Sequence, residues 1–85
     1  MKTKKLLRKI RELLNAERRA QIAKYESLEE VLQKLQTKEV ELRAKLEEAA
    51  GKGRRREILR KLEVVEAQRK KGEKLKKEIK DLRDT

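Results

Sequence analysis

The chain has 85 residues, of which 51% are charged and 35% are hydrophobic, and its formal net charge is +11. A chain of this length forms one domain, and its aliphatic residues suffice for a seam between helices but not for the centre of a globule. The absence of Cys and His excludes disulfides, zinc sites of the usual kind and catalysis by a thiol or an imidazole.

The remaining composition favours an all-α, non-catalytic protein. There is no Pro and only three Gly, whereas Leu, Glu, Lys, Arg and Ala are abundant, so local propensity favours helix nearly everywhere. Carboxylates on water-facing helix surfaces keep ordinary pKa values, and two paired helices form no dry pocket. We therefore expect no catalytic residues, no metal, no cofactor and no small-molecule substrate.

An apolar stripe with a seven-residue period extends along most of the chain. Its positions are Leu7, Leu14, Gln21, Leu28, Leu35, Leu42 and Ala49, followed after one break by Ile58, Val65, Gly72 and Ile79. Because a seven-residue repeat drifts slowly around a 3.6-residue helix, this pattern predicts a left-handed coiled coil.

The break at Gly51-Lys52-Gly53 indicates that the helix finds its partner within the same chain. We expect one domain over residues 1–85, with a helix over about 4–50, a turn at 51–53 and a second helix over about 54–83. Gly51 is the residue best suited to the left-handed C-terminal conformation that often ends a helix. The short connection makes the two helices antiparallel neighbours.

A fold at Lys52 brings together residues whose numbers sum to about 104, so that Leu46 meets Ile58 and Leu32 faces Gly72. Residues 25–50 have a net charge of −3 and residues 51–85 of +7, as expected for helices that pair. The predicted architecture is thus a long antiparallel two-helix coiled-coil hairpin with an N-terminal helical overhang.

An alternative architecture follows from the sequence Ser27-Leu28-Glu29-Glu30, which matches a capping box at a helix start. If Ser27 caps a helix, the first helix breaks near residue 26 and the chain forms a three-helix bundle. Against this, neither Gly nor Pro marks a turn there, and the same pattern is common inside continuous helices.

The longer helix would extend beyond the shorter one, leaving residues 1–20 without a partner in the two-helix arrangement. Five aliphatic side chains cluster on one face of this overhang: Leu6, Leu7, Ile10, Leu13 and Leu14. Glu17, Gln21 and Lys24 continue that face as a polar interruption. The cluster is the predicted protein-interaction site; it would self-associate, bind an acidic or apolar protein partner, or fold back on its own chain.

Basic residues concentrate at the open end of the hairpin and at its tip, which favours nucleic-acid backbone binding as the alternative function. The candidate phosphate contacts are Lys52, Arg54, Arg55, Arg56, Arg69, Lys70, Lys71, Lys74, Lys76 and Lys77. Only one aromatic residue is present, so base stacking is not expected. Interleaved acids favour a salt-bridged, solvated surface as the competing explanation.

The function that we predict from the sequence is a coiled-coil interaction or assembly module, forming a homodimer through the overhang. Val40, Leu59 and Val64 lie off the main stripe and would mark a further helix–helix contact. A membrane surface is a poor partner because Trp and Phe anchors are absent. The basic N-terminus is not followed by an apolar run, so we expect a cytoplasmic protein.

Overall fold

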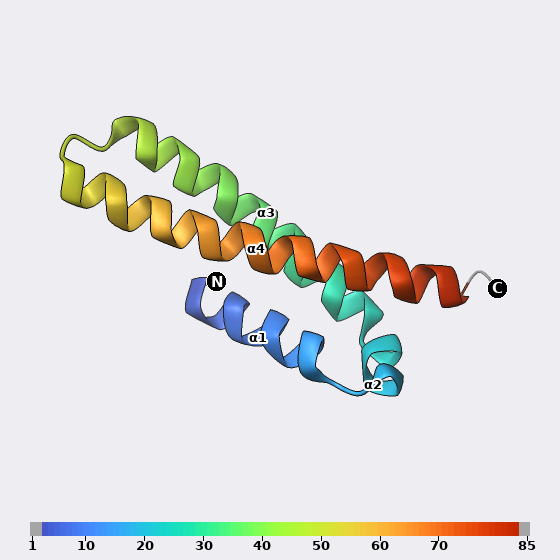
Figure 1. Ribbon diagram of the computed structural model, residues 1–85. Helices are drawn as coiled ribbons and strands as arrows, with labels where there is room; N and C mark the ends of the chain where they lie inside the picture. The colour runs from blue at the N-terminus through green and yellow to red at the C-terminus, as the bar shows by residue number, and fades with distance from the viewer. Residues whose placement is uncertain (1–2, 84–85) are drawn as a thin grey trace.

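The computed structural model describes residues 3–83, which form four α-helices. In chain order these are α1 (Thr3–Asn15), α2 (Arg18–Ala23), α3 (Tyr25–Glu48) and α4 (Lys52–Arg83). Figure 1 shows an elongated molecule built around the two longest helices, and its extents are 50 × 20 × 18 Å. The predicted all-α class is confirmed.

The predicted antiparallel hairpin is also confirmed, and it consists of α3 and α4 (Figure 1). Near the tip, Nη1 of Arg55 donates a hydrogen bond of 2.9 Å to the carbonyl oxygen of Leu46. Farther along, Nζ of Lys76 lies 3.6 Å from Oε2 of Glu29. These pairs have residue numbers that sum to 101 and 105, close to the register that the apolar stripe predicts.

The turn between the hairpin helices differs in detail from the prediction. Ala49 leaves α3 in an extended conformation (φ −70°, ψ 126°), and Gly51 has a φ of 159° instead of a left-handed helical one. The second helix begins at Lys52, one or two residues earlier than expected. The chain therefore reverses through extended backbone at residues 49–51.

The single helix expected over residues 4–50 is interrupted twice. Glu17 is extended (φ −63°, ψ 151°), which separates α1 from α2, and Lys24 (φ −101°, ψ 22°) separates α2 from α3. The second interruption lies close to the break near residue 26 in the alternative architecture. It is not made by a capping box, however, because Ser27 lies inside α3 and the N-cap of that helix is Lys24.

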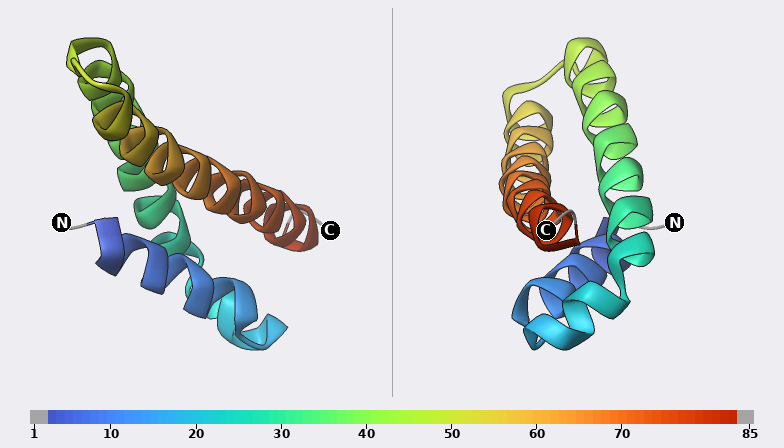
Figure 2. Two further views of the ribbon diagram at one scale, coloured as in Figure 1. Left: turned by 60° about the vertical axis from the view of Figure 1, so that its left-hand side comes forward. Right: turned by 90° about the vertical axis from the view of Figure 1, so that its right-hand side faces the viewer.

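The first interruption turns α1 back along the hairpin, which corrects the expectation that residues 1–20 have no partner in the chain. In Figure 1, α1 lies beside α4 and points in the same direction, and Figure 2 shows it packed below both hairpin helices. The physical reason is the hydrophobic effect: the apolar face of α1 is too large to remain in water, and the nearest apolar surface belongs to its own hairpin.

The molecule therefore has two parts. The open half, residues 3–39 and 65–83, contains α1, α2 and the parts of α3 and α4 that pack against α1. The distal arm, residues 40–64, is a two-helix hairpin that extends beyond the N-terminus of α1 (Figures 1 and 2). The buried hydrophobic core includes Leu6, Ile10, Leu13, Leu28, Val31, Leu32, Leu35, Leu42, Ile58, Leu62, Val65, Leu75 and Ile79.

Candidate functional site

The aliphatic cluster predicted as a docking site is largely buried against other helices of the same chain. The side chains of Leu6 and Ile10 are completely buried and Leu13 is nearly so, whereas Leu7 and Leu14 are partly buried against the same core. The acidic residues 25–48 form α3, and this helix receives α1 of its own chain. Self-association through Leu6, Ile10 and Leu13 would require α1 to leave the hairpin.

Gln21, the one polar residue of the apolar stripe before the glycine turn, has a specific role in this folded-back arrangement. Its Nε2 donates hydrogen bonds to the carbonyl oxygens of Leu13 (2.9 Å) and Leu14 (3.2 Å), and the side chain is buried. These carbonyls belong to the last turn of α1. The last carbonyl groups of a helix lack the intrahelical N–H partners that the other carbonyl groups have. Gln21 therefore satisfies the C-terminal end of α1 at the point where the chain turns.

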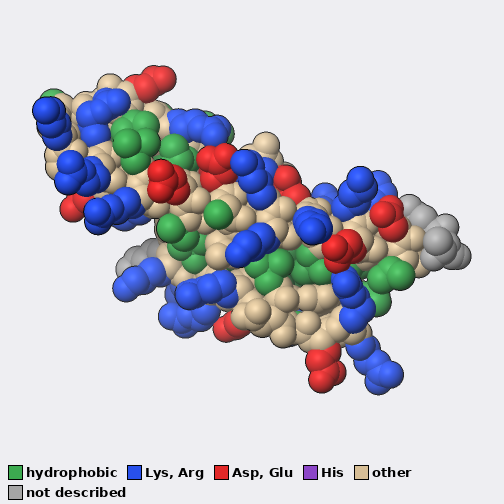
Figure 3. Space-filling view, in the orientation of Figure 1, with side chains coloured by type: hydrophobic (Ala, Val, Ile, Leu, Met, Phe, Trp, Pro, Cys, Tyr) green, Lys and Arg blue, Asp and Glu red, His purple; other side chains and the backbone are tan. Residues whose placement is uncertain are grey.

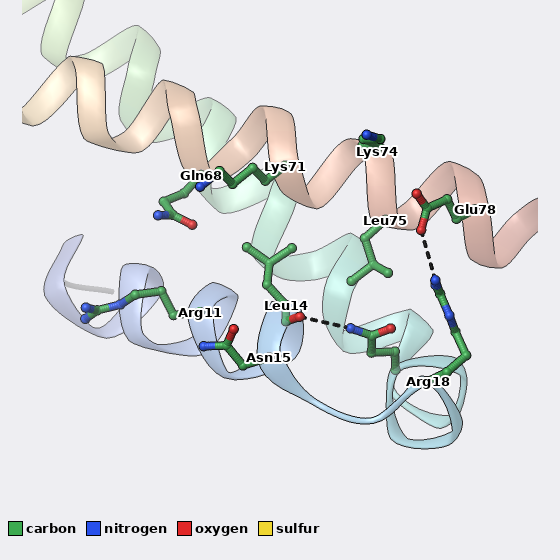
Figure 4. A pocket seen from close by; sticks show the side chains of 10 residues that line it. Arg11, Leu14, Asn15, Arg18, Gln68, Lys71, Lys74, Leu75 and Glu78 are labelled. Carbon is green, nitrogen blue, oxygen red and sulfur yellow. Dashed lines mark hydrogen bonds and ion pairs between the residues drawn. The ribbon is translucent and has the colours of Figure 1, made fainter.

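A polar groove lies between α1–α2 on one side and α4 on the other, with a volume of about 530 Å³. Its walls carry four basic side chains, one carboxylate and three amides, and two leucines form its apolar part. The lining residues are Arg11, Leu14, Asn15, Arg18, Gln21, Gln68, Lys71, Lys74, Leu75 and Glu78 (Figure 4). The groove exists because α1 is folded back.

The four basic side chains of the groove are neutralised unequally. Nη2 of Arg18 lies 3.1 Å from Oε2 of Glu78, while Nε of Arg11 donates a longer hydrogen bond of 3.3 Å to the carbonyl oxygen of Leu7. Within residues 3–83, no carboxylate forms an ion pair with Arg11, Lys71 or Lys74. The groove thus holds an excess of positive charge.

Three of the predicted phosphate contacts are instead occupied by ion pairs. Arg69 donates to the buried carboxylate of Glu39 and, at 2.9 Å, to Glu73, and the hydrogen bond with Glu39 is the main cause that raises the pKa of Arg69. This pair also explains how the seam tolerates Glu39, the one charged residue in its predicted apolar register.

The ion pairs of Lys70 and Lys76 lie at the surface of the hairpin. Nζ of Lys70 is 3.0 Å from Oε1 of Glu66, and this contact lowers the pKa of Glu66. Lys76 reaches across to Glu29 of α3. Lys70, Lys76 and Arg69 are therefore less available to an external anion than the sequence alone indicates, and the salt-bridged surface expected as the competing explanation holds for these three.

The basic residues of the tip are exposed but do not converge. Lys52, Arg54, Arg55 and Arg56 all lie in the first turns of α4, at the opposite end of the molecule from the C-terminal part of α4 (Figure 1). The guanidinium of Arg55 is used to satisfy the Leu46 carbonyl at the end of α3. Local structure thus accounts for one of the three consecutive arginines, and none of the four basic residues lines the groove between α1 and α4.

Sequence reasoning identified Lys71 and Lys74 but missed the residues that face them from the N-terminal segment. Lys77, the remaining predicted contact in α4, is exposed outside the groove. Arg11, Asn15 and Arg18 are spaced by four and three residues, which is the spacing of one helix face. That spacing was a visible signal, but its meaning depended on α1 folding back.

Comparison with protein-family models, curated proteins and solved structures yields no match to this chain. Among residues 3–83, no helix is both long and apolar enough to span a membrane. The same part of the chain contains no cluster of three or more acidic, His or Cys side chains that could hold a metal ion.

Proposed function

We propose that this chain is a non-catalytic nucleic-acid-binding protein that holds the phosphate backbone along its basic open end. The observation that carries the proposal is that Arg11, Lys71 and Lys74 line one groove and have no ion-pair partner among the described carboxylates. A cation that is already paired inside the protein gains little from an external anion, whereas an unpaired one gains the full attraction of a phosphate.

The whole surface supports the same proposal at longer range. Figure 3 shows Lys and Arg side chains spread over the visible face from the tip to the open end, with fewer acidic ones between them. With a net charge of +11, the protein attracts polyanions from a distance and releases their counterions on contact. Because the chain has a single aromatic residue, we expect binding that is insensitive to base sequence.

Fluorescence anisotropy with labelled single-stranded and duplex oligonucleotides tests the proposal. We expect binding at 50 mM KCl that weakens at least tenfold at 200 mM KCl, because each phosphate contact contributes about −0.7 to −0.9 to the slope of log K against log salt. Scrambled sequences should bind within about threefold of one another. Absence of binding at 50 mM KCl, or affinity that does not change with salt, would contradict the proposal.

The second candidate is the predicted assembly module, now with a different surface. Val40, Leu59 and Val64 remain exposed on the distal arm, at 62%, 42% and 48% of their full accessible area. Aliphatic side chains at these positions favour contact with another helical protein or a second copy, although singly exposed aliphatics are common. Sedimentation separates the candidates, because apolar association should persist in 0.5 M NaCl whereas phosphate binding should not.

A further inference from the structure

Glu78 is the single carboxylate of the basic groove, and it is bound to one of the four cations that line it. Its Oε2 lies 3.1 Å from Nη2 of Arg18, a residue sixty positions earlier in the chain. Figure 4 shows this pair at one end of the groove, while nearer the other end Gln68 extends from α4 toward α1 and Lys71 runs along α4 beside it. An internal anion thus occupies the Arg18 end of the groove.

The contact between Arg18 and Glu78 is weak enough to be exchanged. The two side chains keep 49% and 44% of their accessible area, so water and salt screen their attraction. Exposed ion pairs of this kind contribute little to stability. A phosphodiester offers the same guanidinium two non-bridging oxygens for a bidentate contact and also reaches the unpaired lysines, which Glu78 does not neutralise.

Gln68 provides an independent sign that the groove is incomplete without a ligand. Its Oε1 is buried and has no hydrogen-bond partner within residues 3–83. A half-turn of the amide replaces this acceptor with an NH₂ group, which can donate to a phosphate oxygen. Buried polar groups are normally satisfied, so the amide of Gln68 leaves a hydrogen-bonding position in the cationic groove that water or a ligand atom can fill.

We propose that this groove seats a phosphodiester group and that Glu78 occupies part of the seat in the free protein, so that binding transfers Arg18 from Glu78 to the phosphate. The inference rests on the proposed function and specifies its site. Arg11 and Arg18 reach the groove only while α1 and α2 are folded back against α4, so the bound phosphate also stabilises the docked position of α1.

The first test removes the carboxylate of Glu78, which competes with the phosphate for Arg18. Glu78→Gln removes the carboxylate from Arg18, and Glu66→Gln is the matched control, because it removes the same charge from α4 at a side chain outside the groove. Measured by anisotropy on a labelled 20-nucleotide strand at 100 mM KCl, E78Q should bind about threefold to fivefold more tightly than E66Q. Equal affinities for the two variants would overturn the role of Glu78.

The second test removes the cations of the seat. The double variant Lys71→Gln/Lys74→Gln should weaken binding at least tenfold and flatten the salt slope by more than one unit. Lys77→Gln/Lys80→Gln is its control, because these two exposed lysines of α4 lie outside the groove and carry the same charge. Circular dichroism should show that all variants keep the helical content of the wild-type protein.

The outcomes distinguish a failure of the groove proposal from a failure of nucleic-acid binding itself. If both lysine doubles weaken binding equally while the wild-type protein binds, the groove proposal fails and nucleic-acid binding by total charge stands. If the wild-type protein does not bind at 50 mM KCl, the proposed function fails.

A competition experiment identifies the source of the phosphate group, with inorganic phosphate and phosphatidylglycerol vesicles as competitors. If 10 mM inorganic phosphate displaces the oligonucleotide, or if the vesicles bind equally well, the ligand is not a phosphodiester of nucleic acid.

Discussion

The open half and the distal arm use the same hairpin but exclude water to different degrees. The side chains buried to less than 2% exposure all belong to the open half: Leu6, Ile10, Leu28, Leu35, Val65 and Ile79. The best-buried seam residues of the arm, Leu42, Ile58 and Leu62, retain 6–8%. Two helices cover only one side of each other's apolar stripe, and a third helix is needed to close the seam.

This difference indicates what α1 contributes. It converts half of a coiled-coil hairpin into a small three-helix core, and in doing so it creates the cationic groove beside α4. Stability and the candidate site therefore share one structural cause, the fold-back at Ala16 and Glu17. Variants that loosen α1 should make the open half resemble the distal arm.

The largest effect is expected for Ile10→Asp. The side chain is fully buried in the open half, so an unpaired carboxylate there should cost about 3–5 kcal/mol and release α1 from the hairpin. Urea unfolding followed by circular dichroism measures the loss, and hydrogen exchange should show reduced protection in α1 and in the facing part of α3. Leu59→Asp, on the exposed surface of the arm, is the control and should cost less than about 0.5 kcal/mol. Equal losses of unfolding free energy for the two variants would show that Ile10 is no better buried than Leu59.

The next effect concerns the boundary between the two regions, where Arg69 neutralises the buried carboxylate of Glu39. Arg69→Leu should destabilise the protein by about 3 kcal/mol, because it leaves Glu39, which is 2% exposed, without its cation.

The double variant Glu39→Leu/Arg69→Leu completes the cycle and should be as stable as the wild-type protein or more so, because apolar residues then fill the seam. Urea midpoints of the four proteins measure the coupling. Additive losses in the double variant would contradict a direct interaction between the two side chains.

A smaller effect is expected at Gly72, where α1 approaches α4 closely. A Cβ at this position would lie 2.5 Å from Cδ2 of Leu32 and 2.8 Å from Cδ1 of Ile10. Gly72→Ala should therefore lose about 1 kcal/mol, since crowding of the core exceeds the gain in helix propensity.

The control for Gly72 is Gly53→Ala in the distal arm, where a Cβ meets no atom within 4 Å, and this variant should be neutral or slightly stabilising. Ile10→Val removes the crowded Cδ1 and should recover part of the loss in the Gly72→Ala background. Thermal melts of the three variants suffice. A stabilised Gly72→Ala protein would indicate that α1 is not held close to α4.

The hairpin was predictable from the sequence because its determinants are local: a seven-residue apolar repeat and one pair of glycines near residue 51. The division of the first helix was predicted only as an alternative, with one break near residue 26, because residues 15–24 contain neither Gly nor Pro. The polar interruption at Glu17, Gln21 and Lys24 was visible, yet only the folded-back structure reveals that Gln21 satisfies the end of α1.

The candidate site was predictable only in part, because some of its residues meet only when α1 folds back. Lys71 and Lys74 lie in a basic stretch that any charge analysis identifies. Arg11 and Arg18 become their neighbours through a contact between helices at opposite ends of the chain. Arg69 is likewise not available to an external anion, because it contacts Glu39 across the hairpin, thirty residues away.

The side-by-side placement of Ile10 and Gly72 fixes an order of events during synthesis. Because part of its docking surface belongs to α4, α1 has to wait for roughly 60 further residues before it can pack completely, which takes about 3–12 s at bacterial or eukaryotic elongation rates. During that interval the amphipathic, strongly cationic α1 lacks one of the two helices against which it packs. Full burial of the apolar face of α1 therefore follows the synthesis of α4, the helix that supplies Gly72.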